Sequence, residues 1–119
     1  FSVEEKRQME HPSVIRLGEH ATWRSEGMGK STVFESPRLM VGLNAFEPGQ
    51  SHTLHAHADM DKVYQVVEGE GRFLLEGRSV QLSQGEMLVA PAGVPHGVVN
   101  DGHARLLVLV ILAPGPRRA

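Results

Sequence analysis

The sequence has no cysteine among its 119 residues, so it offers no disulfide, no thiolate metal ligand and no cysteine nucleophile. It also lacks an excess of one charge: 12 Lys and Arg against 14 Asp and Glu give −2, which argues against a basic nucleic-acid surface. The longest apolar run, Leu106 to Ala113, is far shorter than the roughly 20 residues of a membrane span. These absences predict a small soluble domain in the cytoplasm, with neither nucleic acid nor membrane as a partner.

The chain is rich in glycine and proline, with 13 and 7 residues, which is typical of short strands joined by tight turns. Its length predicts a single domain with one core. We expect a polar N-terminal extension over residues 1–12, where Ser2 and Glu5 could cap a helical turn, a β domain over 13–113 and a C-terminal tail over 114–119. The predicted strands are 14–17, 31–35, 39–46, 52–57, 63–68, 71–75, 78–82, 87–90, 96–100 and 104–112.

About ten short strands without a long helix predict an all-β sandwich or barrel. The segment 106–112 is apolar on both faces, so we expect it at the centre of a sheet or against a partner subunit. Asn100-Asp101-Gly102 has the composition of a hairpin turn between the last two strands.

Histidine is the most suggestive residue type, with seven copies, three of them between positions 52 and 57. Side chains alternate along a strand, so His55 and His57 point to the same face. Two neutral imidazoles at this spacing can hold a divalent metal, although an isolated His-x-His pair is also a common exposed polar feature. His52 has the opposite parity in a regular strand and is expected at the surface or the rim.

Two motifs extend this observation. The first reads Gly, five residues, His-x-His, three or four residues, Glu, six residues, Gly, and it is matched by Gly49, His55, His57 and Gly69. The second reads Gly, five residues, Pro-x-Gly, two residues, His, three residues, Asn, and it is matched at every position by Gly85, Pro91, Gly93, His96 and Asn100. With these motifs the chain resembles the cupin superfamily. The resemblance implies an all-β single-domain cupin, a jelly-roll-like double-stranded β-helix barrel.

The resemblance also implies a metal site in the mouth of the barrel. His55, His57 and His96 are the expected ligands of a divalent ion, commonly iron, manganese, nickel, zinc or copper in the family. Three histidines from two strands form one facial set and leave positions open for water or substrate. Pro91 and Gly93 would turn the chain so that His96 enters the barrel. Asn100 would fix that turn or contact the side chains that bind the metal.

The sequence departs from the first motif at its carboxylate, because Lys62 stands where the family usually has Glu. Lys62 could swing outward, could sit near the pocket as an anion-binding or acid–base group, or could be displaced by a slip that brings in Asp61. We favour three histidines with Asp61 as the best candidate for a fourth ligand, and Met60 as a weaker one. A site without the carboxylate is more positive and suits anionic ligands.

Other residues are assigned to the pocket by parity. Thr53 should face inward with His55 and His57, and Tyr64 and Val66 should do the same on the parity of position 62. Tyr64 could donate a hydrogen bond to a ligand, but core packing is favoured. Arg105 is expected as a solvated edge charge, and Trp23 on the barrel or in a dimer contact. Lining or core positions are expected at Phe46, Phe73, Met87 and Val89.

Two functions of different classes remain open. The first is a metal-dependent enzyme, dioxygenase- or isomerase-like, acting on a small and possibly anionic molecule at a three-histidine site. The second is a non-catalytic cupin domain that binds or senses a small molecule or a sugar, since no clear acid–base pair accompanies the metal ligands. Small cupins commonly pair through their strands, and the segment 106–112 offers an apolar surface, so we expect a homodimer.

Overall fold

The computed structural model describes residues 12–116, and the regular structure of this part is almost entirely β. One short 3-10 helix, η1 (Leu17–His20), precedes the strands. The strands are β1 (Gly29–Glu35), β2 (Met40–Phe46), β3 (Ser51–His55), β4 (Asp61–Glu68), β5 (Glu70–Leu75), β6 (Arg78–Ser83), β7 (Met87–Ala90), β8 (His96–Val99) and β9 (Leu106–Ala113). No helix in the described part of the chain is long and apolar enough to cross a membrane.

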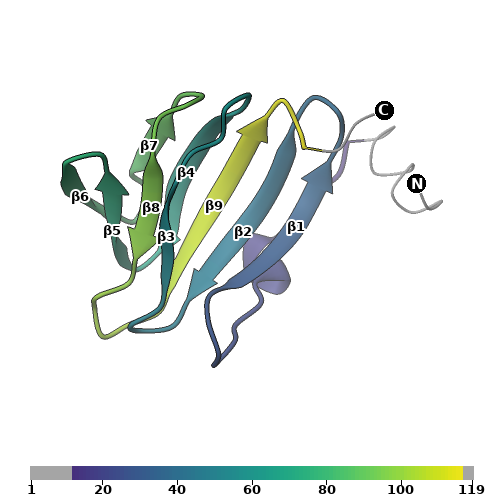
Figure 1. Ribbon diagram of the computed structural model, residues 1–119. Coiled ribbons are helices and arrows are strands. Elements are labelled where there is room, and N and C mark those ends of the chain that lie inside the picture. The colour runs from purple at the N-terminus through teal and green to yellow at the C-terminus, as the bar shows by residue number, and fades with distance from the viewer. Residues whose placement is uncertain (1–11, 117–119) are drawn as a thin grey trace.

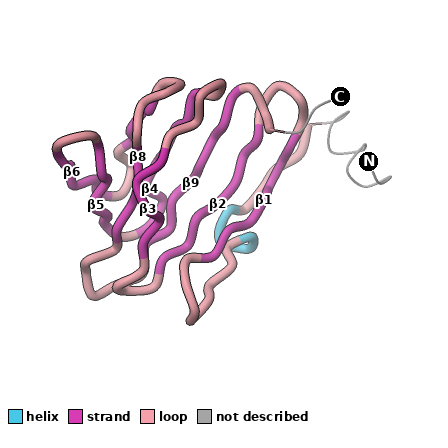
Figure 2. The backbone as a smooth tube through the Cα atoms, viewed as in Figure 1, coloured by secondary structure: helices cyan, strands magenta, loops and turns pink. Residues whose placement is uncertain are grey.

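The strands form two antiparallel sheets that face each other (Figure 1). The larger sheet has the order β1-β2-β9-β4-β7, and the smaller one has the order β3-β8-β5-β6. Loops gather at both ends of the strands, as the tube in Figure 2 shows. This arrangement confirms the predicted all-β sandwich.

β9 lies between β2 and β4, which confirms the central position expected for the doubly apolar segment. Its alternate residues Leu106, Val108 and Val110 face the smaller sheet. Its residue Leu107 packs on the outer side with Trp23. Both faces of β9 are therefore covered with apolar side chains, which explains why its sequence does not alternate. The main core between the sheets consists of Phe46, Tyr64, Val66, Phe73, Val98, Leu106, Val108 and Val110.

Two local predictions are wrong. The segment 14–17 is not a strand; Val14 is 85% exposed, while Leu17 begins η1 and packs on the outer face of the larger sheet. Asn100-Asp101-Gly102 is not a hairpin turn, because β8 and β9 lie in different sheets and the turn carries the chain from one sheet to the other. The segment 14–17 is apolar and the segment 100–102 has turn-forming residues, as the predictions assumed. Tertiary contacts, which local composition does not contain, decide where each segment packs. The cap expected at Ser2 and most of the predicted 1–12 extension lie outside the described residues.

Candidate metal centre

The structure brings His55, His57 and His96 together at one end of the sandwich. His55 is the last residue of β3 and His96 is the first residue of β8, and these two residues are directly paired in the sheet. Their ring centroids are 4.4 Å apart, and the His57 ring lies 5.1 Å from that of His55 and 5.4 Å from that of His96. One nitrogen from each ring lies within 4.8 Å of the others. Small side-chain rotations can close such a group around one cation.

Hydrogen bonds to the backbone orient two of the rings. Nδ1 of His55 donates to the Thr53 carbonyl at 2.7 Å, and Nδ1 of His96 donates to the Val94 carbonyl at 3.0 Å. A carbonyl only accepts, so the proton sits on Nδ1 and the Nε2 lone pair is free in each ring. Nε2 of His96 is buried and has no hydrogen-bond partner. A buried lone pair without a donor is costly, and a metal ion would satisfy it, so this donor set fits a divalent cation.

The electrostatics of the site favour neutral imidazoles. Burial lowers the pKa of His96 to about 4, more strongly than the hydrogen bond to Val94 raises it, and the positive charge of Lys62 lowers it further. Burial and Lys62 also lower the pKa of His57. Metal ions bind the neutral form of imidazole, so these residues do not have to lose a proton first at neutral pH.

A cavity of about 180 Å³ adjoins the histidines. Its two walls come from different sheets: the imidazoles are carried by β3 and the loop after it, and the opposite wall by β1, β2, β4 and β9. The lining residues are Lys30, Met40, Asn44, His52, His55, His57, Lys62, Val110 and Leu112. A space of this size accommodates only a small molecule.

His52 also lines the cavity, so it lies on the same side as His55 and not on the opposite face expected from a regular strand. The pairing of β3 with β8 runs from His52 opposite Val98 to His55 opposite His96, so β3 contains one extra residue. This bulge breaks the alternation and brings the His52 ring to 4.4 Å from that of His55. For the same reason Thr53 is exposed, and the expectation that it faces inward is wrong. Burial, followed by the charge of Lys30, lowers the pKa of His52 to about 4.

A glycine marks the bulge in the sequence. Gly97 of β8 lies opposite the extra residue, and a Cβ there would approach the His52 carbonyl oxygen and the Leu54 nitrogen at 2.9 Å each. Only glycine leaves room for the bulged backbone at this position. The sequence therefore carries a signal for the bulge, but position 97 lies outside the fixed positions of the two motifs.

Of the three alternatives for Lys62, the structure shows the one that brings its charge to the pocket. Lys62 is 4% exposed and lines the cavity, with Nζ 4.8 Å from the centre of the Tyr64 ring. Burial, and then the charge of Lys30, lower the pKa of Lys62 to about 8. Asp61 is exposed, and its carboxylate accepts a hydrogen bond from the Ala92 amide at 2.8 Å. Neither Asp61, the best candidate for a fourth ligand, nor Met60 lines the cavity, and Asp61 is not in the histidine group.

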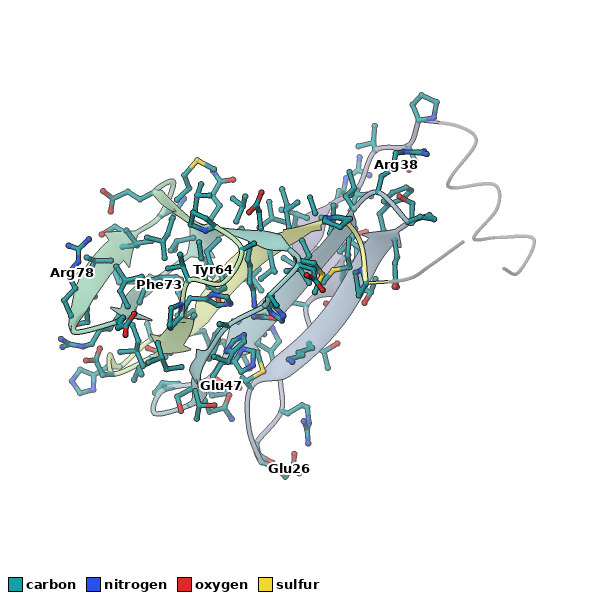
Figure 3. All side chains as sticks on the ribbon, turned by 45° about the horizontal axis from the view of Figure 1, so that its top comes forward. Glu26, Arg38, Glu47, Tyr64, Phe73 and Arg78 are labelled. Carbon is teal, nitrogen blue, oxygen red and sulfur yellow. The ribbon has the colours of Figure 1, made fainter. Side chains whose placement is uncertain are left out.

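The parity predicted for β4 is confirmed, since Tyr64 and Val66 are buried between the sheets. Tyr64 packs against Phe73, with ring centroids 5.2 Å apart, and Figure 3 shows both side chains in the interior. Its hydroxyl is buried without a hydrogen-bond partner. Phe46 and Phe73 are core residues, as expected. Met87 and Val89 are more than half exposed because β7 turns Leu88 and Ala90 inward, so their assignment to lining or core is wrong.

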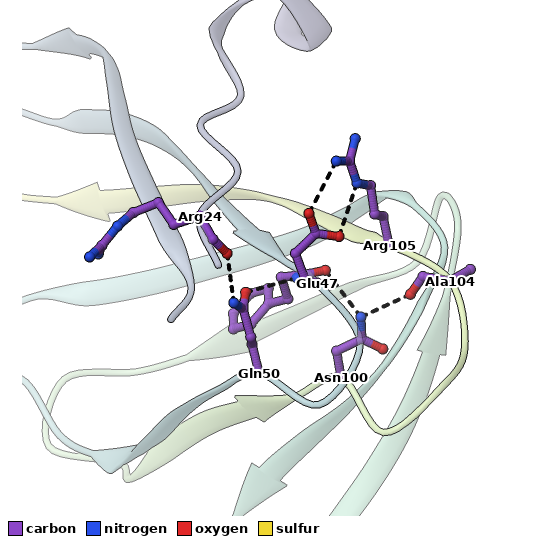
Figure 4. A network of polar contacts seen from close by, with 7 residues as sticks. Arg24, Glu47, Gln50, Asn100, Ala104 and Arg105 are labelled. Atoms are coloured by element: carbon purple, nitrogen blue, oxygen red, sulfur yellow. Dashed lines mark hydrogen bonds and ion pairs between the residues drawn. The ribbon is translucent and has the colours of Figure 1, made fainter. Parts of the chain in front are cut away.

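Two residues of the second motif, Asn100 and Gly93, hold the backbone at opposite ends of β8. Nδ2 of Asn100 donates to the Phe46 carbonyl at 3.1 Å and to the Ala104 carbonyl at 2.9 Å (Figure 4). Oδ1 of Asn100 accepts a hydrogen bond from the Gly102 amide at 3.2 Å. Asn100 therefore holds the turn after β8 and not the Pro91–Gly93 turn expected from the motif, and it does not line the cavity. The Gly93 amide donates to the His57 carbonyl at 2.7 Å, with φ at +81°, a conformation that favours glycine. This bond ties the loop before His96 to the loop that carries His57.

Arg105 and Trp23 lie away from the cavity. Arg105 forms two hydrogen bonds with the Glu47 carboxylate, at 3.0 and 3.1 Å, and its guanidinium lies 4.4 Å above the Trp23 ring. Arg105 remains half exposed, in agreement with the predicted edge charge. Trp23 packs on the outer face of the larger sheet, one of the two places expected for it.

Known proteins match the sequence and the fold of this chain. The family model described as "Cupin domain" matches residues 42–112. An oxalate-binding protein from Thermotoga maritima is 26% identical over 103 residues, which cover 87% of this chain and 84% of that protein. A gentisate 1,2-dioxygenase from Ralstonia sp is 28% identical over 87 residues, which cover 72% of this chain but 24% of that protein.

A solved structure agrees as well. The TT1209 protein from Thermus thermophilus superposes with a TM-score of 0.82 at 39% identity, covering 87% of this chain and 98% of that one. The family match includes the histidines, the substituted carboxylate position and Asn100. The two sheets are those of a double-stranded β-helix, and the chain belongs to the cupin superfamily.

Proposed function

We propose that this cupin binds one divalent metal ion, iron, manganese, nickel or zinc, through His55, His57 and His96, and that it is a metal-dependent enzyme acting on a small molecule. The observation that carries the proposal is the convergence of three imidazoles, two of which turn their Nε2 lone pairs away from backbone hydrogen bonds. When bound, such a metal supplies Lewis-acid or oxygen-activating chemistry. The relative named as a gentisate dioxygenase supports a dioxygenase-like reaction, and an isomerase-like reaction fits the same site.

Other residues of the chain shape the space in which a substrate would bind. The three histidines leave ligand positions open on the cavity side, where a substrate can reach them. Val110 and Leu112 give the cavity an apolar wall, which limits water around a bound molecule. Asn44, which is buried on β2, offers an amide to the same space.

The proposal is tested by metal analysis of the purified protein, followed by oxygen consumption and product analysis with a panel of diols and keto acids. We expect about one metal per chain and turnover that is lost in His55→Ala and His96→Ala. Protein that takes up no stoichiometric metal from any of the four ions would overturn the metal site. Metal binding with turnover unchanged in both variants would overturn the catalytic assignment.

A second candidate is a non-catalytic binding cupin, favoured by the relative named as an oxalate-binding protein, which matches most of this chain. Among the cavity-lining residues, no carboxylate is placed to act as a general base. Tight ligand binding to the metal-loaded protein without conversion of any panel compound would support this function over the enzyme.

We further propose a homodimer. The edge strand β7 presents Met87 and Val89 on its outer face, where they are 56% and 54% exposed. Light scattering at micromolar concentration should give twice the chain mass of 13.0 kDa. Met87→Ser combined with Val89→Ser should shift the protein toward monomer.

A cytoplasmic location stays a prediction from composition, to be checked by fractionation.

A further inference from the structure

The cavity beside the histidines is unusually positive. Two of the three lysines of the chain, Lys30 and Lys62, line it, and none of its lining residues is acidic. Lys30 extends from β1 and Lys62 from β4, so the two ammonium groups approach from separate strands of the larger sheet.

Lys62 is buried without a compensating anion. Its side chain is 4% exposed, and within residues 12–116 it contacts the face of the Tyr64 ring and has no carboxylate within ion-pair distance. The neighbouring acid Asp61 points away to the Ala92 amide. Burying a charge is unfavourable unless it is paired, so the native protein gains most from a negatively charged group next to this ammonium.

A metal ion bound by the histidines would make a negatively charged ligand still more favourable in this cavity. The three ligands are neutral imidazoles, so the ion would keep its full double charge beside the two lysines. In the family pattern a glutamate at the position of Lys62 would lower that charge. Here the same position raises it, so the missing negative charge has to come with the ligand.

We infer that the ligand of this cavity is a small carboxylate, with a carboxylate group bound between Lys62 and Lys30 and a second oxygen function directed at the three histidines. Dicarboxylates and 2-hydroxy or 2-keto acids have this arrangement of oxygens and the size that the cavity of about 180 Å³ admits. The inference deepens the proposed function, since it names the ligand class of the same cavity. Lys62 is the main anchor because it is buried, and Lys30 is the weaker one because it is exposed.

The test uses the full chain stripped of metal with a chelator, titrated with malonate and with its neutral analogue malonamide by calorimetry. We expect malonate to bind with a dissociation constant on the order of 1 mM or tighter, and malonamide to bind at least about tenfold more weakly. Lys62→Gln should weaken malonate binding at least about tenfold, Lys30→Gln about threefold, and Lys62→Arg should keep most of it. The matched control is Arg78→Gln, which removes one positive charge at the exposed edge of the smaller sheet (Figure 3) and should leave malonate binding unchanged.

Three outcomes would overturn the inference: malonate fails to bind in the millimolar range, malonamide binds equally well, or Arg78→Gln weakens malonate binding as much as Lys62→Gln does. Circular dichroism of each variant shows whether it is folded, and Lys62→Arg keeps the test decisive if Lys62→Gln is unstable. The titration contains no metal, so its failure leaves the three-histidine site standing. Failure of metal uptake, conversely, leaves the malonate result valid.

Discussion

The two walls of the cavity meet opposite requirements. On one wall β3 and the loop after it present imidazoles, and burial lowers the pKa of His52 and His57 among them, which keeps these two rings neutral. On the other wall the larger sheet presents Lys62 and Lys30, whose ammonium groups can only donate. The imidazole wall follows the family motif and the lysine wall departs from it. Under the two proposals, the part of the site that follows the motif would hold the metal, and the part that departs from it would select the charge of the ligand.

The largest effect should come from breaking the imidazole wall. His55→Ala and His96→Ala should each lower metal affinity at least about 100-fold, beyond the roughly 10- to 100-fold cost of losing a group that merely supports a ligand. Calorimetric titration with Zn²⁺ measures the change. His103→Ala is the matched control, because His103 is exposed in the loop between β8 and β9 and should leave the affinity unchanged. Equal losses in His103→Ala and His96→Ala would contradict the assignment.

The second effect should come from reversing the charge of the lysine wall. Lys62→Glu restores the residue type of the family motif and replaces a repulsive charge near the metal by an attractive one. Metal affinity should rise about tenfold or more, and malonate binding to metal-free protein should disappear. The same two titrations measure both changes on one variant. A variant that is folded and loses metal affinity would show that position 62 does not face the histidines in solution.

A third effect concerns pH. Burial lowers the pKa of Lys62 to about 8, so its ammonium loses the proton as pH rises through 8. Malonate affinity of the metal-free protein should therefore fall by up to about tenfold between roughly pH 7 and pH 9. His52 and His57 face the same space, but their lowered pKa values keep them neutral over this range, and Lys30 is exposed. Lys62→Arg should bind malonate with little change over the same pH range, because guanidinium keeps its proton.

The smallest effect should come from weakening the hydrogen bond between the Asp61 carboxylate and the Ala92 amide. The Asp61 carboxylate holds the Ala92 amide, and this bond fastens the loop that leads to His96. Asp61→Asn removes the charge from the bond and should cost about 1 kcal/mol locally, with metal affinity reduced about threefold. Hydrogen exchange at Ala92 should accelerate as well. Asp59→Asn changes an exposed carboxylate in the loop just before β4 and should alter neither measurement.

Those parts of the fold that depend on pattern alone could be predicted. The double hydrophobicity of β9 placed it correctly at the centre of a sheet, and the parity of β4 placed Tyr64 and Val66 in the core. The three histidines could be singled out because the spacing of the motifs is specific. In each case a regular strand or a fixed count of residues carried the information.

The wrong predictions concern segments that depart from regular strand geometry or are too short to show a pattern. The extra residue in β3 reversed the expected sides of His52 and Thr53, and a bulge of this kind leaves no trace in the alternation of polar and apolar residues. Met87 and Val89 were misplaced because a four-residue strand gives too little pattern to fix its inward face. Lys62 could be located but not oriented, because whether a lysine points into a pocket depends on what surrounds it in three dimensions.

The position of Lys62 also has a genetic consequence. Lysine and glutamate codons differ by one base at their first position. A single nucleotide exchange could therefore convert a cavity that favours a negatively charged ligand into one whose own glutamate can bind the metal, and the reverse. Because the side chain lies on β4 between β7 and β9, such an exchange would leave the surrounding scaffold in place. New chemical preferences could thus arise in this architecture without any rebuilding of the protein around them.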